Sequence, residues 1–395
     1  MCNIRVNMRV LLIKAVLTVL LTVCGYCVSA AISGSGIHGA ADSVVYADSV
    51  LSAGYKSFDV VFYNDTLPLY GTVTVPDDEF FVGKKKDEKI PGVVLISGSG
   101  THNRDEEVFG IHRPFADMAA YLSSNGVAVL RFDDRGWKRR LSVEPTSYDK
   151  MMDAQAALDY LSRLEMVDSK RVGFIGHSEG GGIVFRLAGG AGVLNGARGA
   201  AKCAFAISIA GPAVSMDSIL VMQNRDILIG RGMPEEKAEA YCSMLRYVFG
   251  VKKAALKVGR EITEEEKGVA RDTLTAIGKR YGIEGMAFNA MLLLGMNSRW
   301  MNSALMENPA EDIAAMRIPV LGIYGDKDVQ VRAPENMQSL RENLGRRVLR
   351  GSRIVSFDVN HLMLPCSTGS VAEYKELPAG TSVQVLEEIL RWIFR

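Results

Sequence analysis

The chain has 395 residues, of which 48% are hydrophobic and 23% are charged, and its formal net charge is +1 at pH 7. This composition can bury a large core, which excludes an intrinsically disordered protein, and the length leaves room for a second module or an insertion. The near-neutral charge gives no electrostatic basis for binding nucleic acid.

The first 30 residues have the order of a secretory signal. Basic residues surround the apolar run 10–23, and small residues follow at 28–31. This pattern predicts cleavage near Ala30 and export of the mature protein, periplasmic or secreted. An uncleaved membrane anchor is the alternative, because the apolar run is close to the shortest length that spans a bilayer. A lipid anchor is disfavoured, since neither Cys24 nor Cys27 follows a small residue.

The cysteines do not predict a disulfide framework. Of the six cysteines, three fall within the signal, which leaves Cys203, Cys242 and Cys366 in the mature chain. An odd number cannot form a fully paired set within one chain, and no close pair indicates a metal site. Whether any of these three cysteines forms a disulfide stays open.

The segment after the signal changes character several times. Residues 31–54 form a polar stretch without periodicity, which we interpret as a linker. Two short strands are expected at 56–63 and 69–75, separated by turn-forming residues at 64–66. The charged run 84–89 is interpreted as a solvated loop.

From Gly92 onward, β-branched apolar runs alternate with amphipathic stretches. This alternation predicts a parallel sheet that is covered by helices on both faces. Strands are expected at 93–96, 127–132, 172–175, 204–209, 320–324 and 353–357, and helices at 115–123, 151–164, 181–187, 335–344 and 383–393.

One long segment interrupts the alternation. Between about 212 and 310 the pattern is almost wholly helical, with a helix start at 233–236, where a proline and two acids occupy the first turn. We therefore expect an α/β core formed by residues 55–211 and 311–395, with a helical cap inserted at 212–310.

The segment Gly176-His177-Ser178-Glu179-Gly180 carries the strongest chemical signal. It follows a predicted strand and precedes a helix that begins with two further glycines. A serine on a sharp strand-to-helix turn needs neighbours without side chains, so that its hydroxyl projects above the sheet. We therefore assign Ser178 as a nucleophile; a purely structural turn is the alternative.

A serine hydroxyl needs a base that accepts its proton and an acid that orients this base. For a serine in such a turn, the chain order is serine, acid, histidine. His361 is the one histidine that follows Ser178 in the sequence, so chain order assigns it as the base. Asp326 and Asp328 compete as the acid. We favour Asp328, because it lies past the turn and nearer the histidine, while Asp326 is expected to cap the turn.

The tetrahedral intermediate of acyl transfer needs N–H donors for its oxyanion. One expected donor is the backbone N–H of Glu179, and the other lies in the glycine-rich loop after the strand 93–96. In that loop we assign the Ser99 N–H, with Gly98 or Gly100 as alternatives. A phosphate-binding loop is disfavoured, because the lysine that follows the glycines of such loops is absent.

Two further residues are candidates for substrate binding. His102 follows the glycine-rich loop and is a candidate for the mouth of the site, and Trp300 is the best candidate for a pocket wall. Methionines are frequent in the insertion. Flexible thioethers suit a pocket for varied acyl groups, but we interpret any single one as core.

Charged residues near the site are interpreted as structural. An ion-pair network that fixes loop geometry is expected among Arg104, Asp105, Glu106 and Arg135. His177, inside the serine turn, is expected to pack against a neighbouring loop and not to transfer protons.

Blocks of sequence from Leu69 onward carry a family resemblance. They are 69–76, 98–106, 131–136, 176–180, 298–309, 325–331 and 360–362. These blocks resemble bacterial α/β-hydrolase carboxylesterases related to the serine aminopeptidases and prolyl-oligopeptidase-like hydrolases. The resemblance implies the α/β-hydrolase fold and the hydrolysis of small acyl esters through an acyl-enzyme, with no metal or organic cofactor.

The expected partner is a small-molecule ester. A nucleic acid is not expected, and a membrane would be contacted only through an uncleaved N-terminal segment. The oligomeric state stays open. Two other functions are kept as alternatives: a peptidase for short peptides, whose amine-binding carboxylate would be Glu179, Glu307 or Glu311, and a non-catalytic binding protein on a hydrolase scaffold.

Overall fold

The computed structural model describes residues 54–83, 88–139, 141–191 and 202–395. The expected signal at 1–30, nearly all of the expected linker and most of the charged run 84–89 lie outside these residues. Within the described ranges, no helix combines the length and the apolar character that a membrane span requires.

The described residues form one eight-stranded sheet in the order β1-β2-β4-β3-β5-β6-β7-β8. Its strands are β1 (Tyr55–Asn64), β2 (Leu67–Pro76), β3 (Ile90–Ile96), β4 (Ala128–Phe132), β5 (Val167–His177), β6 (Phe205–Ile209), β7 (Val320–Gly325) and β8 (Arg353–Phe357). The β1–β2 and β2–β4 pairs are antiparallel, and the remaining pairs are parallel. The predicted α/β class with a mostly parallel sheet is confirmed.

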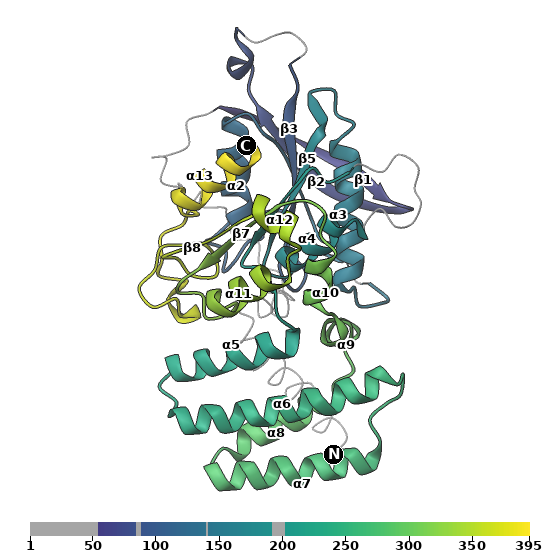
Figure 1. Ribbon diagram of the computed structural model, residues 1–395, viewed down its shortest axis with the longest axis vertical. Helices are drawn as coiled ribbons and strands as arrows, with labels where there is room; N and C mark the ends of the chain where they lie inside the picture. Colours follow the sequence, from purple (N-terminus) through teal and green to yellow (C-terminus); the bar gives the residue numbers. More distant parts are fainter. Residues whose placement is uncertain (1–53, 84–87, 140, 192–201) are drawn as a thin grey trace, which may run out of the picture.

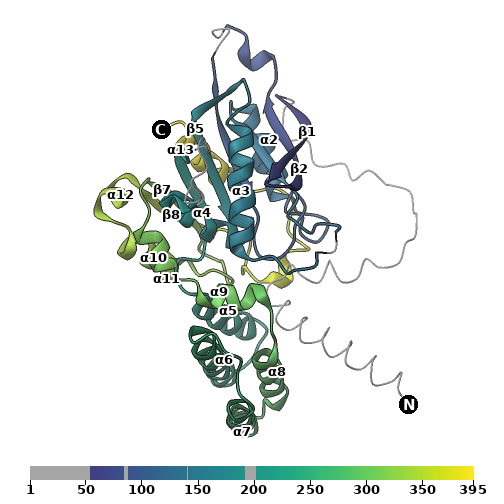
Figure 2. The same ribbon diagram turned by 90° about the vertical axis from the view of Figure 1, so that its right-hand side faces the viewer.

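Helices cover both faces of the sheet, which explains why the central strands are unbroken apolar runs. On one face α2 (Pro114–Ser124) packs against α13 (Val383–Ile393), and on the other α3 (Ser147–Leu161) packs against α4 (Glu179–Gly189) (Figure 2). Shorter elements complete the core: α10 (Pro309–Ala314), α11 (Ala333–Asn343), α12 (Arg346–Gly351), and the 3-10 helices η1 (Glu79–Phe81) and η3 (Val371–Glu373).

A helical cap lies between β6 and β7 in the chain. It consists of α5 (Met216–Gly230), α6 (Glu235–Lys257), α7 (Glu264–Tyr281), α8 (Glu284–Gly295) and α9 (Arg299–Met306). These helices bury an apolar cluster of their own, which includes Met244, Val248 and Phe249. Figure 1 shows α6, α7 and α8 at one end of the molecule, with α5 and α9 between them and the sheet.

The loops after β3, β5, β7 and β8 all leave the sheet at the carboxyl ends of parallel strands. Carboxyl ends of parallel strands meet at one edge of a sheet, and ligand sites of such sheets lie outside this edge. The topology therefore brings four loops from distant parts of the sequence to the side of the core that faces the cap.

Candidate active site

Ser178 occupies a strained turn between β5 and α4. Its backbone has φ 54° and ψ −120°, a conformation that non-glycine residues rarely adopt. The flanking glycines permit this turn: a Cβ on Gly176 would lie 2.1 Å from the Gly180 carbonyl oxygen, and a Cβ on Gly180 would lie 2.1 Å from that of Ile96. The hydroxyl of Ser178 is thereby presented to the loops that follow β7 and β8.

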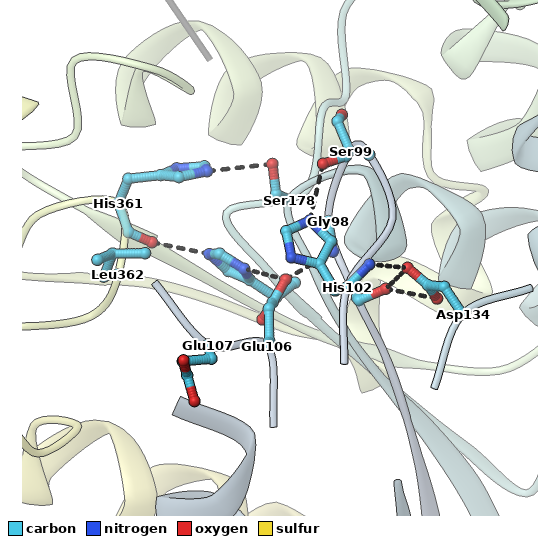
Figure 3. A network of polar contacts seen from close by, with 12 residues as sticks. Gly98, Ser99, His102, Glu106, Glu107, Asp134, Ser178, His361 and Leu362 are labelled. Carbon is cyan, nitrogen blue, oxygen red and sulfur yellow. Dashed lines mark hydrogen bonds and ion pairs between the residues drawn. The ribbon is translucent and has the colours of Figure 1, made fainter. Parts of the chain in front are cut away.

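Two hydrogen bonds join Ser178, His361 and Asp328; the one between His361 and Ser178 is drawn in Figure 3. Nε2 of His361 lies 3.1 Å from the Ser178 hydroxyl oxygen, and Nδ1 of His361 lies 2.7 Å from Oδ2 of Asp328. The carboxylate of Asp328 accepts a hydrogen bond from the Nδ1–H of His361, which leaves Nε2 without a proton and able to accept the proton of the serine. The structure thus brings together the three residues assigned from the sequence.

The position of Asp328 is fixed by its own backbone. Its second oxygen, Oδ1, accepts hydrogen bonds from the N–H groups of Gln330 at 2.7 Å and Val331 at 2.8 Å. The side chain of Asp328 is buried, whereas Asp326 is exposed. The geometry therefore places Asp328, and not Asp326, against the histidine.

A second buried pair lies behind the nucleophile. Oε1 of Glu106 lies 3.0 Å from Nδ1 of His177, and Nε2 of His177 lies 2.9 Å from the carbonyl oxygen of His361. Both ring nitrogens of His177 thus face oxygen acceptors, so with an ionised Glu106 both must donate, and the ring is an imidazolium.

The surroundings of this pair favour its charged form. Burial disfavours charge on both groups, but the attraction and hydrogen bond between them outweigh it: the pKa of His177 is raised and the pKa of Glu106 is lowered. Glu106 therefore pairs with His177 and not with the arginines expected from the sequence. His177 packs against a neighbouring loop, as expected, and connects that loop to the backbone of His361.

The loop after β3 is positioned for an oxyanion hole. Ser99, Glu179 and Ser178 line the same pocket. The N–H of Gly98 donates to Oε1 of Glu106 at 2.6 Å, so it is occupied and does not serve as the oxyanion donor. Gly100 is not among the described residues that line this pocket, so Ser99 is the candidate donor from this loop.

Side chains also fix the start and end of this loop. Asp134 accepts hydrogen bonds from the Ser97 hydroxyl at 2.8 and 2.9 Å and from the His102 N–H at 2.9 Å (Figure 3). Lys150 donates to the Ser97 hydroxyl at 3.0 Å and to the Gly98 carbonyl at 2.6 Å. Lys150 lies in the first turn of α3 and belongs to no catalytic motif, so no sequence pattern predicted this role.

His102 does not lie where a substrate-binding residue was expected. Its side chain is buried, and Nε2 lies 2.8 Å from the carbonyl oxygen of Ser99. It is absent from the described residues that line the pocket beside Ser178. His102 folds back beneath its own loop because the Ser99 carbonyl offers its ring an acceptor there; its position corrects the expectation of a residue at the mouth.

A pocket with about 540 Å³ of empty space, part of it open to solvent, adjoins Ser178. Apolar side chains from α5 form much of its wall, and the core and α9 supply the rest. The lining residues are Gly98, Ser99, Ser178, Glu179, Pro212, Met216, Ile219, Leu220, Gln223, Trp300, Gln330, Val331 and His361. The cap therefore supplies a large part of the wall of this pocket.

Trp300 connects the cap to the core at this pocket. Its indole Nε1–H donates to Oε1 of Glu179 at 2.8 Å, and the hydroxyl of Ser147 donates to the same oxygen. At the start of α9, Glu144 accepts hydrogen bonds from the Ser298 hydroxyl and the Trp300 N–H. Trp300 thus forms part of the pocket wall, the position that was expected for it.

The arginines near the site hold loops and do not enter the pocket. Arg104 pairs with Asp133 at 2.8 Å, Arg131 pairs with Asp105 at 2.8 Å, and Arg135 pairs with Asp149 and Asp153. None of these side chains is among the described residues that line the pocket beside Ser178. This arrangement fits the structural role expected for them, although the partners differ from the expected single network.

Burial makes the thiols of the described cysteines less reactive. Cys203, Cys242 and Cys366 are free thiols, and burial raises the pKa of Cys203 to about 12 and that of Cys242 to about 11. Such thiols are poor nucleophiles at neutral pH. Among the described residues, no group of three or more His, Cys, Asp or Glu side chains could hold a metal ion.

A family match agrees with the fold. The model of a family described as "Alpha/beta hydrolase family" matches residues 93–364. Esterase EstD of Thermotoga maritima is 25% identical over 329 residues, and the match covers 83% of this chain but only 66% of the length of that relative. Among solved structures, an esterase of Pyrococcus furiosus is 16% identical with a TM-score of 0.45, over 86% of this chain and 91% of that chain. A thioesterase domain from the curacin biosynthetic pathway is 10% identical with a TM-score of 0.45, over 86% and 99%.

Proposed function

We propose, from the premise that this chain belongs to the alpha/beta hydrolase family, that it is a serine hydrolase that cleaves small carboxylic esters through an acyl-enzyme. One observation carries the proposal: Ser178, His361 and Asp328 form a continuous chain of hydrogen bonds beside a pocket. The similarity to an esterase of Thermotoga maritima supports the choice of an ester as substrate.

In the first half of the reaction, the Ser178 hydroxyl oxygen attacks the ester carbonyl while His361 accepts its proton at Nε2. Asp328 stabilises the imidazolium that forms. The negative charge on the former carbonyl oxygen is held by the N–H groups of Ser99 and Glu179. His361 then gives the proton to the alcohol oxygen, the ester C–O bond breaks and the acyl group remains on Ser178.

In the second half, water takes the place of the alcohol. His361 accepts a proton from the water, whose oxygen attacks the acyl carbon, and the Ser178–acyl bond breaks as the proton returns to the serine oxygen. The carboxylic acid is released. No residue outside the three catalytic groups and the two N–H donors is required for proton balance.

The walls of the pocket favour a small apolar acyl group. Met216, Ile219 and Leu220 come from α5, and Val331 comes from the loop after β7. Apolar walls with a few polar groups near the reacting atoms are typical of small-molecule sites. Short acyl chains are therefore the proposed substrates for the first assays.

The contacts of the acidic residues disfavour the peptidase alternative. A peptidase that recognises a free amine needs a carboxylate that is available to it. Oε1 of Glu179 accepts hydrogen bonds from Ser147 and Trp300, and Glu307 pairs with Arg186 at 2.7 Å. Glu311 is exposed and does not line the pocket beside Ser178.

The alternative of a non-catalytic binding protein is disfavoured by the assembled catalytic residues.

The test compares two substrates and two proteins. We expect the wild type to hydrolyse a short-chain aryl ester much faster than an aminoacyl anilide, and Ser178→Ala to lose the esterase activity. Faster cleavage of the anilide would favour the peptidase, and equal esterase rates for wild type and Ser178→Ala would contradict the serine mechanism.

We also propose that the protein is exported and that its signal is cleaved near Ala30. The support is the order of basic, apolar and small residues at the N-terminus. Amino-terminal sequencing of the protein from its natural host tests this proposal. A mature chain that begins close to residue 31 is expected, and an intact chain recovered with the membrane would favour the uncleaved anchor.

A further inference from the structure

Lys150 lies beside the catalytic site without belonging to the catalytic residues. Its side chain is largely buried, with 11% exposed. Its Nζ lies 2.6 Å from the Gly98 carbonyl oxygen, 3.0 Å from the Ser97 hydroxyl, 3.1 Å from Oδ2 of Asp134 and 3.3 Å from the Gly100 carbonyl oxygen. A single ammonium group therefore contacts the loop after β3 on both sides of Ser99.

The contact with Gly98 has a direct consequence for Ser99. The carbonyl of Gly98 and the N–H of Ser99 belong to the same peptide unit, which is planar, and in a trans unit the two groups point in opposite directions. A donor that fixes the carbonyl oxygen therefore also fixes the direction of the Ser99 N–H. This N–H is the proposed oxyanion donor, and Ser99 and Ser178 line the same pocket; both residues are labelled in Figure 3.

The contact also strengthens the donor. A charge-assisted hydrogen bond to a carbonyl oxygen polarises the whole peptide unit, and hydrogen bonds in such a chain reinforce one another. The Ser99 N–H is then a better donor to a developing oxyanion than an unassisted amide would be. A positive charge behind the peptide unit also stabilises negative charge in front of it.

The position of Lys150 disagrees with local helix preference. It is the fourth residue of α3, whose N-terminus is closed by a capping box between Thr146 and Asp149. The helix dipole opposes a cation in this first turn. Residues that violate a local preference are often found at functional sites, and here the cation is held by Asp134 and two backbone carbonyls of the loop.

The ammonium stays charged in this environment. Burial alone would lower the pKa of Lys150, but the nearby carboxylates of Asp134, Glu179 and Glu106, together with the hydrogen bond to Asp134, raise it above its ordinary value. The side chain therefore supplies a permanent positive charge at neutral pH and is not suited to act as a base.

We propose that Lys150 is a positioning residue for the oxyanion hole, which aims and polarises the peptide unit between Gly98 and Ser99. This proposal rests on the proposed serine esterase function, because it assigns a role within that mechanism. Lys150 acts through the Ser99 N–H and does not contact the reacting atoms. Its effect is confined to the transition state, where the oxyanion forms.

The test is the purified full-length variant Lys150→Met, which keeps an unbranched side chain one atom shorter than lysine and removes the ammonium group. Lys253→Met is the matched control, since Lys253 forms an ion pair with Asp217 in the cap and lies outside the site. We expect kcat on a short-chain aryl ester to fall about tenfold to a hundredfold with KM nearly unchanged, a smaller loss than the about 10²–10³-fold that removal of an oxyanion donor costs. The control should keep wild-type kcat.

Two further measurements separate this role from a merely structural one. The affinity for an alkylboronic acid, whose tetrahedral serine adduct places an oxygen in the oxyanion hole, should fall by the same factor as kcat/KM. The final extent of labelling by a fluorophosphonate should stay at one per chain, because the catalytic residues remain assembled. If Lys150→Met does not fold, Lys150→Gln, which retains two N–H donors without the charge, replaces it under the same criteria.

The outcomes distinguish this inference from the proposed function. An active wild type, an inactive Ser178→Ala and a folded Lys150 variant with kcat within twofold of the wild type would overturn the role of Lys150 alone. A rise in KM without a fall in kcat or in boronate affinity would overturn this role as well. A wild type whose activity does not depend on Ser178 would overturn the proposed function instead.

Discussion

The carboxylate of Glu106 lies 3.0 Å from Nδ1 of His177, and both side chains are buried behind the nucleophile. The pair links two loops of the site: Glu106 accepts the Gly98 N–H, and His177 donates to the His361 carbonyl. The oxyanion loop and the loop of the catalytic base are thus held by one ion pair, so its charge state affects the stability of the site.

This pair makes stability depend on pH. Attraction by Glu106 raises the pKa of His177 above its ordinary value despite burial. A raised pKa in the folded state contributes stability that is fully present below about pH 6.5 and is lost as the pH rises through the raised value. The other titratable groups near the ring are His361 and Asp328.

We therefore expect His177→Gln to reduce the free energy of unfolding by about 3 kcal/mol at pH 6, and by less at pH 9. Urea unfolding of both proteins across this range measures the difference. In a Glu106→Gln background the decrease of this difference with pH should be lost or reversed, because the attraction that raises the pKa of His177 is gone and burial, which lowers it, remains. With Glu106 in place, a difference that is constant or grows with pH would contradict the charged pair.

The choice between the two aspartates after β7 leads to a second prediction. Asp328→Asn should lower kcat by about 10⁴-fold, because an amide no longer holds the imidazole in the tautomer that accepts the serine proton. Asp326→Asn is the control and should stay within twofold, since its side chain is exposed. Steady-state kinetics on an aryl ester, with melting curves to verify folding, measure both; a larger loss in Asp326→Asn would reverse the assignment.

The glycines of the serine turn can be tested with a matched pair. A Cβ on Gly180 would lie 2.1 Å from the Ile96 carbonyl oxygen, whereas a Cβ on Gly182 would meet Pro212 at an ordinary 3.6 Å. Gly180→Ala should therefore destabilise the protein by about 3 kcal/mol or more. Gly182→Ala should be neutral or stabilising by up to about 1 kcal/mol, because alanine favours a helix. Thermal unfolding of the two variants measures this difference in stability. Equal melting temperatures would contradict the close packing of Gly180 against the Ile96 carbonyl.

The strands and helices of the core could be predicted because their patterns are local. Buried strands such as β3 and β7 are short apolar runs, and α13 repeats its apolar residues at helical spacing. Ser178 could be predicted from a motif whose glycines have a steric reason, and His361 from chain order. The choice of Asp328 as the partner of His361 required the structure, because Asp326 lies only two residues away in the sequence.

The supporting residues could not be predicted, because their roles depend on contacts between distant segments. Lys150 meets the loop after β3 from the start of α3, and Glu106 meets His177 across 71 positions of sequence. His102 was expected at the mouth, but the fold of its own loop turns it toward the Ser99 carbonyl. Periodicity and motifs carry no information about such loop conformations.

Covalent labelling of the nucleophile tests the central claim most directly. Purified protein treated with a fluorophosphonate should gain one adduct per chain, the modified peptide should contain Ser178, and esterase activity should fall in proportion to labelling. His361→Ala should slow this labelling strongly, because the base that accepts the serine proton is missing. Esterase activity that persists after complete labelling, or an adduct on a residue other than Ser178, would contradict the account.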